Sequence, residues 1–212
     1  MVCMTINILS GLALVLFSII LINKTKHLKK AHKRANHLIV GKKPALTRWI
    51  ELFVVLTTFP MMTLWGLSTI GFSFGSVWHD LLAIQIVGIV FMYAGVVFYG
   101  VAVFQLGEKW QLGVDYDEND YFVQKGLYQI SRHPAYLGFF MIFAGILTTY
   151  GNFLIAGFAA GSYVSLFLIA KEEEKFLMFK FNESYATYKT KVSMFLGTKR
   201  CNSMLMGETS ER

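Results

Sequence analysis

The chain has 212 residues, of which 55% are hydrophobic and only 16% are charged, whereas a soluble domain carries about 25% charged residues. Three Pro, two Cys and apolar blocks too long for strands exclude a disordered chain, a disulfide scaffold and a soluble α/β enzyme. The net charge of +7 would suit nucleic acid, but in a membrane protein it more often reflects orientation. We therefore predict an all-α polytopic membrane bundle that does not bind nucleic acid.

Five apolar segments follow one another along the chain, and a transmembrane helix needs about 20 residues. They cover about residues 4–22, 52–70, 81–106, 136–150 and 153–170. Only Gly151 and Asn152 separate the last two, so these are predicted to form a C-terminal helical hairpin. The alternative is a re-entrant pair that does not cross fully. The first segment lacks a basic residue before it, which favours an uncleaved anchor over a signal peptide.

All 20 Lys and Arg residues fall on one side of this arrangement. Nine lie between the first two segments, three between the third and fourth, and eight after the fifth. The extreme N-terminus, the loop 71–80 and the Gly151–Asn152 turn contain none. The positive-inside rule then predicts five transmembrane helices, with the N-terminus outside and the C-terminus in the cytoplasm. Cys3 and Cys201 would lie on opposite sides and form no disulfide.

The predicted single membrane domain covers residues 1–196, and residues 197–212 are read as a polar tail. The basic stretch 23–48 is expected to be a helix on anionic lipid. Its three His residues stand five apart, which fits no helical face, so no metal site is predicted. They are His27, His32 and His37.

Two polar clusters lie on the predicted cytoplasmic side. The first is Arg132-His133-Pro134, in which the Pro is typical of the first turn of a helix. The N-terminus of that helix would favour binding of a carboxylate or phosphate. Alternatively, the Arg132 side chain only extends to the membrane–water interface. The second is Glu172–Glu174. Three adjacent carboxylates at the end of a membrane segment are unfavourable unless a cation pairs with them. Alternatively, they form a helix end that water solvates. Because each cluster ends one arm of the hairpin, we expect a mixed pocket for a ligand with a carboxylate, an amine and a sulfonium.

Spaced motifs surround both clusters. They are Leu106-Gly107-x-x-Trp110, Gly126-Leu127-Tyr128, then after three residues Arg132-His133-Pro134-x-Tyr136-Leu137-Gly138, then Asn152, and finally Glu173-Glu174 with Leu177, Phe181, Tyr185, Tyr188 and Val192. Over about residues 85–196, taken as the catalytic part, this pattern resembles the isoprenylcysteine carboxyl methyltransferase family and the related phospholipid N-methyltransferases. The family often has His at Asp120, Arg at Lys171 and Gly at Asn182. Lys cannot clamp a carboxylate bidentately as Arg does.

The resemblance implies a pocket for S-adenosylmethionine. Its adenosine side would be lined by Phe122, Val123, Gly126 and Tyr128, and its methionine part surrounded by Arg132, His133, Tyr136 and Leu137. Glu173 and Glu174 would hold the amino group or ribose. The catalytic residues would be Arg132, for electrostatic positioning, and one of Glu173 or Glu174, for orientation or as a base.

Methyl transfer is an in-line displacement, so the protein must align the reactants and exclude water. A lipidic acceptor would enter between helices from the bilayer and the cofactor from the cytoplasm. The third apolar segment contains Gly88, Gly95 and Gly100. These glycines would allow close helix packing or an opening between helices for the acceptor. Alternatively, they are ordinary small residues of a membrane helix.

We expect an integral membrane methyltransferase that acts on a lipidic or membrane-associated acceptor, first of all by carboxyl methylation of an isoprenylcysteine. The alternatives are a phospholipid N-methyltransferase or small-thiol S-methyltransferase, an NADPH-dependent sterol-reductase-like enzyme, and a non-catalytic membrane protein. Ala135 and the Glu pair argue against the reductase, and Gln85 is the most notable polar residue within a span. The active site is expected to face the cytoplasm, from a bacterial inner membrane or the endoplasmic reticulum. The acceptor and the oligomeric state stay open.

Overall fold

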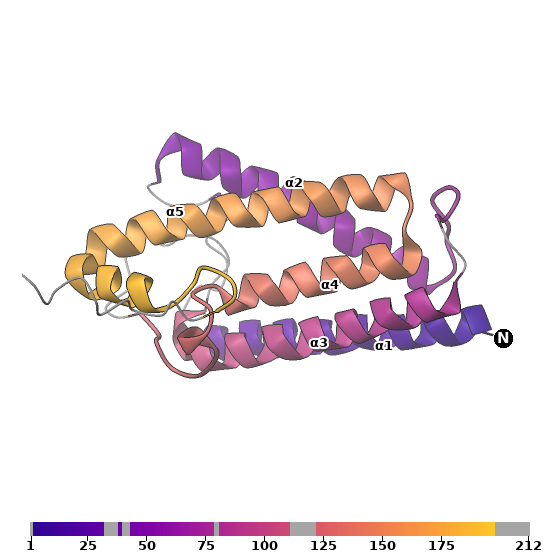
Figure 1. Ribbon diagram of the computed structural model, residues 1–212, viewed down its shortest axis with the longest axis horizontal. Coiled ribbons are helices and arrows are strands. Elements are labelled where there is room, and N and C mark those ends of the chain that lie inside the picture. The colour runs from indigo at the N-terminus through magenta and orange to yellow at the C-terminus, as the bar shows by residue number, and fades with distance from the viewer. Residues whose placement is uncertain (1, 32–37, 40–42, 79–80, 111–121, 198–212) are drawn as a thin grey trace, which may run out of the picture.

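The computed structural model describes residues 2–31, 38–39, 43–78, 81–110 and 122–197. Within these ranges the chain is helical and contains no strand (Figure 1), so the all-α prediction is confirmed. The helices are α1 (Val2–Lys30), α2 (Ala45–Thr69), α3 (Leu82–Leu106), η1 (Gly107–Lys109), η2 (Gly126–Gln129), α4 (Pro134–Tyr150) and α5 (Phe153–Lys191). Asp120, Cys201, His32, His37 and nearly all of the predicted tail lie outside the described residues.

Four of these helices, α1, α2, α3 and α5, are long and apolar enough to cross a membrane. The apolar α4 has 17 residues, which is at the lower limit for a span and corresponds to about 26 Å at 1.5 Å per residue. Both α1 and α5 run past their predicted apolar segments, to Lys30 and Lys191. The basic residues in their last turns favour this extension, because cations stabilise the C-terminal end of a helix.

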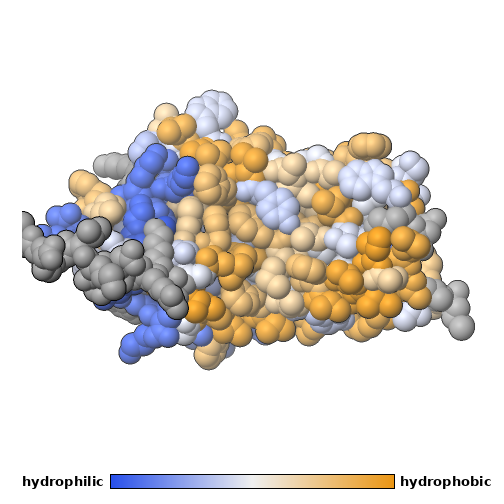
Figure 2. Space-filling model, in the orientation of Figure 1, coloured by the Kyte–Doolittle hydropathy of each residue, from blue (hydrophilic) through white to orange (hydrophobic). Residues whose placement is uncertain are grey.

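The polar residues gather at one end of the molecule. The C-terminal ends of α1, α3 and α5 lie there together with the starts of α2 and α4 (Figure 1). The described Lys and Arg residues lie from Lys24 onward in α1, from Lys171 onward in α5, at Lys43 and Arg48, or between α3 and α4. Figure 2 shows a hydrophilic band at that end and an apolar surface over most of the remaining length. The exposed apolar side chains, among them Phe59 and Phe104, are typical of a surface that faces lipid.

Glycines hold α3 and α4 in close contact. A Cβ placed on Gly95 would lie 2.7 Å from the carbonyl oxygen of Gly138, and one on Gly88 would lie 2.7 Å from that of Gly145. Any side chain at these positions would push the helices apart, so two of the three glycines of this span serve close packing. Gly100 differs, because a Cβ there would meet only the flexible side chain of Ile20.

The hairpin of α4 and α5 is confirmed, and its turn is capped. Asn152 precedes α5, and its side-chain oxygen accepts a hydrogen bond of 2.9 Å from the backbone N–H of Ile155. At the other end of the hairpin Pro134 occupies the first turn of α4, as predicted.

A kink at Asn182 divides α5. This residue has φ 40° and ψ −113°, dihedrals close to the first central position of a type II′ turn, which Gly adopts most easily. Beyond the kink, the last part of α5 turns toward the start of α4 (Figure 1). A Gly at this position would adopt these dihedrals more easily than Asn182 does.

Candidate active site

The segment after α5 is bound to the residues that precede α4. The backbone N–H of Arg132 donates to Ser193 O at 3.0 Å, and that of His133 donates to Met194 O at 3.1 Å. These two bonds fix the backbone of the Arg-His-Pro motif. The N-terminal end of α4 is thus held by a segment about 60 residues later in the sequence.

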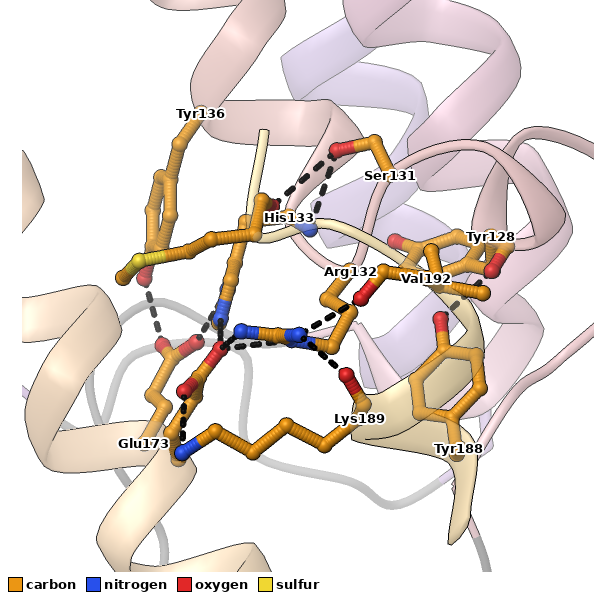
Figure 3. Close-up of polar contacts among 11 residues, drawn as sticks. Tyr128, Ser131, Arg132, His133, Tyr136, Glu173, Tyr188, Lys189 and Val192 are labelled. Carbon is orange, nitrogen blue, oxygen red and sulfur yellow. Dashed lines mark hydrogen bonds and ion pairs between the residues drawn. The ribbon is translucent and has the colours of Figure 1, made fainter. Parts of the chain in front are cut away.

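Arg132 joins α4 to the end of α5 (Figure 3). Its Nε lies 2.7 Å and its Nη2 2.6 Å from Oε1 of Glu174. Its Nη1 donates to the carbonyl oxygens of Lys189 at 3.2 Å and Val192 at 2.6 Å. The predicted proximity of the basic and acidic clusters is confirmed, and every guanidinium nitrogen of this buried side chain already binds the protein.

Glu173 has a different environment from its neighbour. It accepts a hydrogen bond from the Tyr136 hydroxyl, and its Oε2 lies 3.4 Å from Nδ1 of His133. Its side chain is 26% exposed, against 8% for Glu174. Successive helical residues point about 100° apart, so Glu173 faces a cavity while Glu174 faces the guanidinium of Arg132.

His133 stands between the two carboxylates. Burial alone would lower the pKa of this imidazole, but hydrogen bonds and charge interactions with Glu173 and Glu174 outweigh burial and raise the pKa above its ordinary value. The ring stacks on Tyr136, with an interplanar angle of 15°. The site therefore favours a positive charge on His133 between two negative ones.

The third carboxylate, Glu172, belongs to a separate polar group. It accepts a hydrogen bond of 3.3 Å from the hydroxyl of Thr47 on α2 and pairs with Lys175. Nearby on α2, the buried Glu51 forms an ion pair of 2.6 Å with Lys43. Sequence reasoning missed this pair, because Glu51 directly precedes an apolar run and nothing in the sequence marks its partner.

One cavity of about 550 Å³ opens beside Glu173, a size typical of small-molecule sites. Its charged end is bordered by Arg132, His133, Tyr136 and Glu173. Another part of the lining, here called the apolar arm, comes from seven apolar residues of α1 and α2. The seven are Leu14, Phe17, Leu21, Val54, Val55, Phe59 and Met62.

Most of the predicted site residues border this cavity. They are Phe122, Val123, Tyr128, Arg132, His133, Tyr136 and Glu173. Three do not: Gly126 lies against the side chain of Gln105, Leu137 is packed in the interior, and Glu174 binds Arg132. Gly126 borders a second hollow that also includes Phe122 and Val123.

An aromatic cluster forms another wall of the cavity. The ring of Phe122 lies 5.0 Å from that of Phe181, 5.2 Å from Tyr185 and 5.4 Å from Tyr188. The faces of such rings attract cations. Tyr99 on α3 also borders the cavity and was not predicted; the only signal in the sequence is a tyrosine within an apolar span.

Residues 86–179 match the model of the Isoprenylcysteine carboxyl methyltransferase (ICMT) family. A Protein-S-isoprenylcysteine O-methyltransferase of Xenopus laevis is 25% identical over 160 residues, which are 74% of this chain and 50% of the relative. Methanethiol S-methyltransferase 1 of Bradyrhizobium diazoefficiens is 39% identical over 75 residues, 35% of this chain and 25% of the relative. The chain thus spans half or less of the length of these relatives. Over the segment that carries the Arg132 and Glu173–Glu174 clusters, the chain is ICMT-like.

Proposed function

We propose that this protein is an integral membrane methyltransferase that transfers a methyl group from S-adenosylmethionine to a lipidic or membrane-associated acceptor. The observation that carries the proposal is the cavity, which joins an end of mixed charge to an apolar arm. The similarity to the ICMT family and to two methyltransferases supports it.

The charged end fits the cofactor. S-Adenosylmethionine carries a carboxylate, an ammonium and a sulfonium, and this end offers His133 for the anion and Glu173 for a cation. One buried polar atom there, the hydroxyl of Tyr185, has no hydrogen-bond partner within the described part of the chain, and Nε2 of His133 has only Oε1 of Glu174, at 3.5 Å. Burying such atoms is costly unless a ligand or water pairs with them.

We assign the predicted roles only to residues that border the cavity, so Gly126, Leu137 and Glu174 receive no direct role. The adenosine side falls to Phe122, Val123 and Tyr128, which border the cavity. Because Arg132 is engaged by Glu174 and by backbone carbonyls, it acts here as the residue that shapes the pocket. The residue that faces the reactants is Glu173.

The cofactor supplies an electrophilic methyl group. The protein aligns the acceptor with that group and keeps water out. Glu173, oriented by the Tyr136 hydroxyl, places a negative charge beside a bound cation. A carboxylate acceptor is already ionised and needs no base, whereas a thiol acceptor must lose a proton. For a thiol, Glu173 is the base that takes this proton, because the raised pKa of His133 keeps the imidazole protonated.

Carboxyl methylation of an isoprenylcysteine is the acceptor chemistry that we favour, since an apolar arm bordered by α1 and α2 suits a hydrocarbon chain. The second candidate is S-methylation of a small thiol. It is supported by the 39% identity to Methanethiol S-methyltransferase 1 over 75 residues.

We also propose that all five helices cross the membrane, with the N-terminus outside. The proposal counts α4 as a span and places the end that carries the described Lys and Arg residues in the cytoplasm by the positive-inside rule. The active site would then open to the cytoplasm.

Ligand-dependent thermal stabilisation in detergent tests the cofactor assignment. We expect S-adenosylhomocysteine, and not NADPH, to raise the Tm. Glu173→Gln should weaken that binding, and Glu183→Gln, an exposed carboxylate of the same helix, is the matched control. Labelled S-adenosylmethionine incubated with a farnesylated N-acetylcysteine, with methanethiol and with membrane extract then identifies the acceptor. Stabilisation by NADPH alone would contradict the proposal.

A further inference from the structure

We propose that the hydroxyl of Tyr99 binds the polar group of the methyl acceptor at the point where the charged end of the cavity meets its apolar arm. This inference rests on the proposed function. Tyr99 borders the cavity and is only 1% exposed. Its hydroxyl is buried and has no hydrogen-bond partner within the described part of the chain.

The position of Tyr99 sets it apart from the other unpartnered groups. Its ring packs against Phe17 at 5.1 Å and Phe139 at 5.0 Å, and both of these side chains border the cavity. The pKa of Tyr128 is raised by burial and by the negative charge of Glu173, and the phenol of Tyr99 also contributes to this shift. Tyr99 thus packs against the aromatic lining from α1 and α4 and interacts with Tyr128, which in turn interacts with Glu173.

The remaining unpartnered groups lie elsewhere. The hydroxyl of Tyr185 is near Arg132, Glu173 and Glu174, where we place the cofactor. Nε2 of His133 lies in the same place, 3.5 Å from Oε1 of Glu174. The hydroxyl of Ser162 does not border the cavity. Tyr99 is therefore the unpartnered group available to a second ligand on the apolar side.

The backbone of Tyr99 is held rigidly. A Cβ on Gly138 would lie 2.7 Å from the backbone nitrogen of Tyr99, so the close contact of α3 with α4 fixes where this residue sits. Groups that orient a reactant work best when the scaffold determines their position.

A hydrogen bond from the ligand explains an otherwise costly hydroxyl. A buried hydroxyl without a hydrogen-bond partner destabilises the folded state. An amphiphilic acceptor with its hydrocarbon chain in the apolar arm would place a polar atom beside the Tyr99 hydroxyl. The phenol donates to the reacting group of the acceptor, an oxygen or a sulfur, and keeps its own proton. It holds that atom in line with the methyl group.

The test compares Tyr99→Phe with Tyr93→Phe. The Tyr93 hydroxyl bonds to Leu9 O and does not border the cavity, so Tyr93→Phe is the matched control on the same helix. Labelled S-adenosylmethionine is supplied with a farnesylated N-acetylcysteine, with methanethiol and with membrane extract. For Tyr99→Phe we expect kcat/KM for the acceptor to fall at least tenfold, the affinity for S-adenosylhomocysteine to stay unchanged, and the Tm to stay equal or rise.

The outcomes separate the two proposals. If wild type forms labelled product and Tyr99→Phe forms it with unchanged kcat/KM, the role of Tyr99 is refuted and the methyltransferase function stands. A fall in activity accompanied by weaker S-adenosylhomocysteine binding or a lower Tm also refutes it, because the hydroxyl then acts on the cofactor or the fold. If wild type forms no labelled product from any of the three sources, the proposed function is overturned and the inference with it.

Discussion

Replacing Arg132 with Met should destabilise the protein strongly even without any ligand. The change removes two contacts to Glu174, at 2.6 and 2.7 Å, and two bonds to backbone carbonyls of the α5 end. Removing one partner of a buried ion pair costs about 3–5 kcal/mol. Glu174 keeps Lys189 at 3.2 Å, so we expect a value near the lower limit, about 3 kcal/mol.

Thermal unfolding in detergent measures this loss. For a chain of this size 1 kcal/mol corresponds to about 2–4 °C, so the Tm should fall by about 6–12 °C. Lys191→Met removes an exposed cation from the end of α5 and serves as the control. The double variant Arg132→Met/Glu174→Met should regain part of the loss, because replacing both charges by apolar groups leaves no uncompensated ion.

Two results would refute this reasoning. One is a Tm for Arg132→Met within about 2 °C of the Lys191→Met control. That result would mean that the ion pair with Glu174 makes no net contribution to the free energy of unfolding. The other is a double variant whose loss equals the sum of the two single losses, because residues that bind each other should show a coupling energy. Either result would return Arg132 to the role of a ligand-binding residue.

Three further changes follow from the described geometry. Asn182→Gly should raise the Tm by a few degrees, since relief of about 1–3 kcal/mol of backbone strain exceeds the about 0.5–1 kcal/mol entropic cost of Gly; an unchanged or lower Tm would show that the kink is unstrained. Gly95→Ala should cost about 1–3 kcal/mol, because its Cβ would lie 2.7 Å from Gly138 O; a denaturation curve equal to that of wild type would disprove the close contact. The raised pKa of His133 means that its pairing stabilises the fold fully below its unfolded pKa of about 6.5 and is lost as pH rises through the higher folded value. The Tm gap between wild type and His133→Gln should therefore be widest near pH 6 and narrow at alkaline pH, and a constant gap would argue against an ion pair with Glu173.

The helices were predictable because their signals are local. Long apolar runs predicted where the helices lie, and the two-residue Gly151–Asn152 connection predicted the hairpin. The hairpin in turn predicted the contact of Arg132 with the Glu cluster, since antiparallel arms bring their outer ends together. Each of these inferences needed only the order of the segments and the short turn between them.

What the sequence did not reveal depends on helix rotation and on distant partners. Glu173 and Glu174 are adjacent in sequence, yet only the orientation of α5 against α4 decides which of them faces the cavity. The apolar arm comes from α1 and α2, which carry no motif. The partner of Glu51, Lys43, lies eight residues earlier, at a spacing that no single helix would bring into contact.

The hydrogen bonds between the residues before α4 and the segment after α5 have a consequence for biosynthesis. The carbonyl of Val192 and the backbone of Ser193 and Met194 hold Arg132 and His133 in place, and these carbonyls are made after all five helices. During synthesis the hairpin can form while the guanidinium still lacks these partners. The pocket therefore reaches its final shape only when the ribosome has released this last stretch, so a chain interrupted before Val192 would lack the contacts that hold Arg132 and His133.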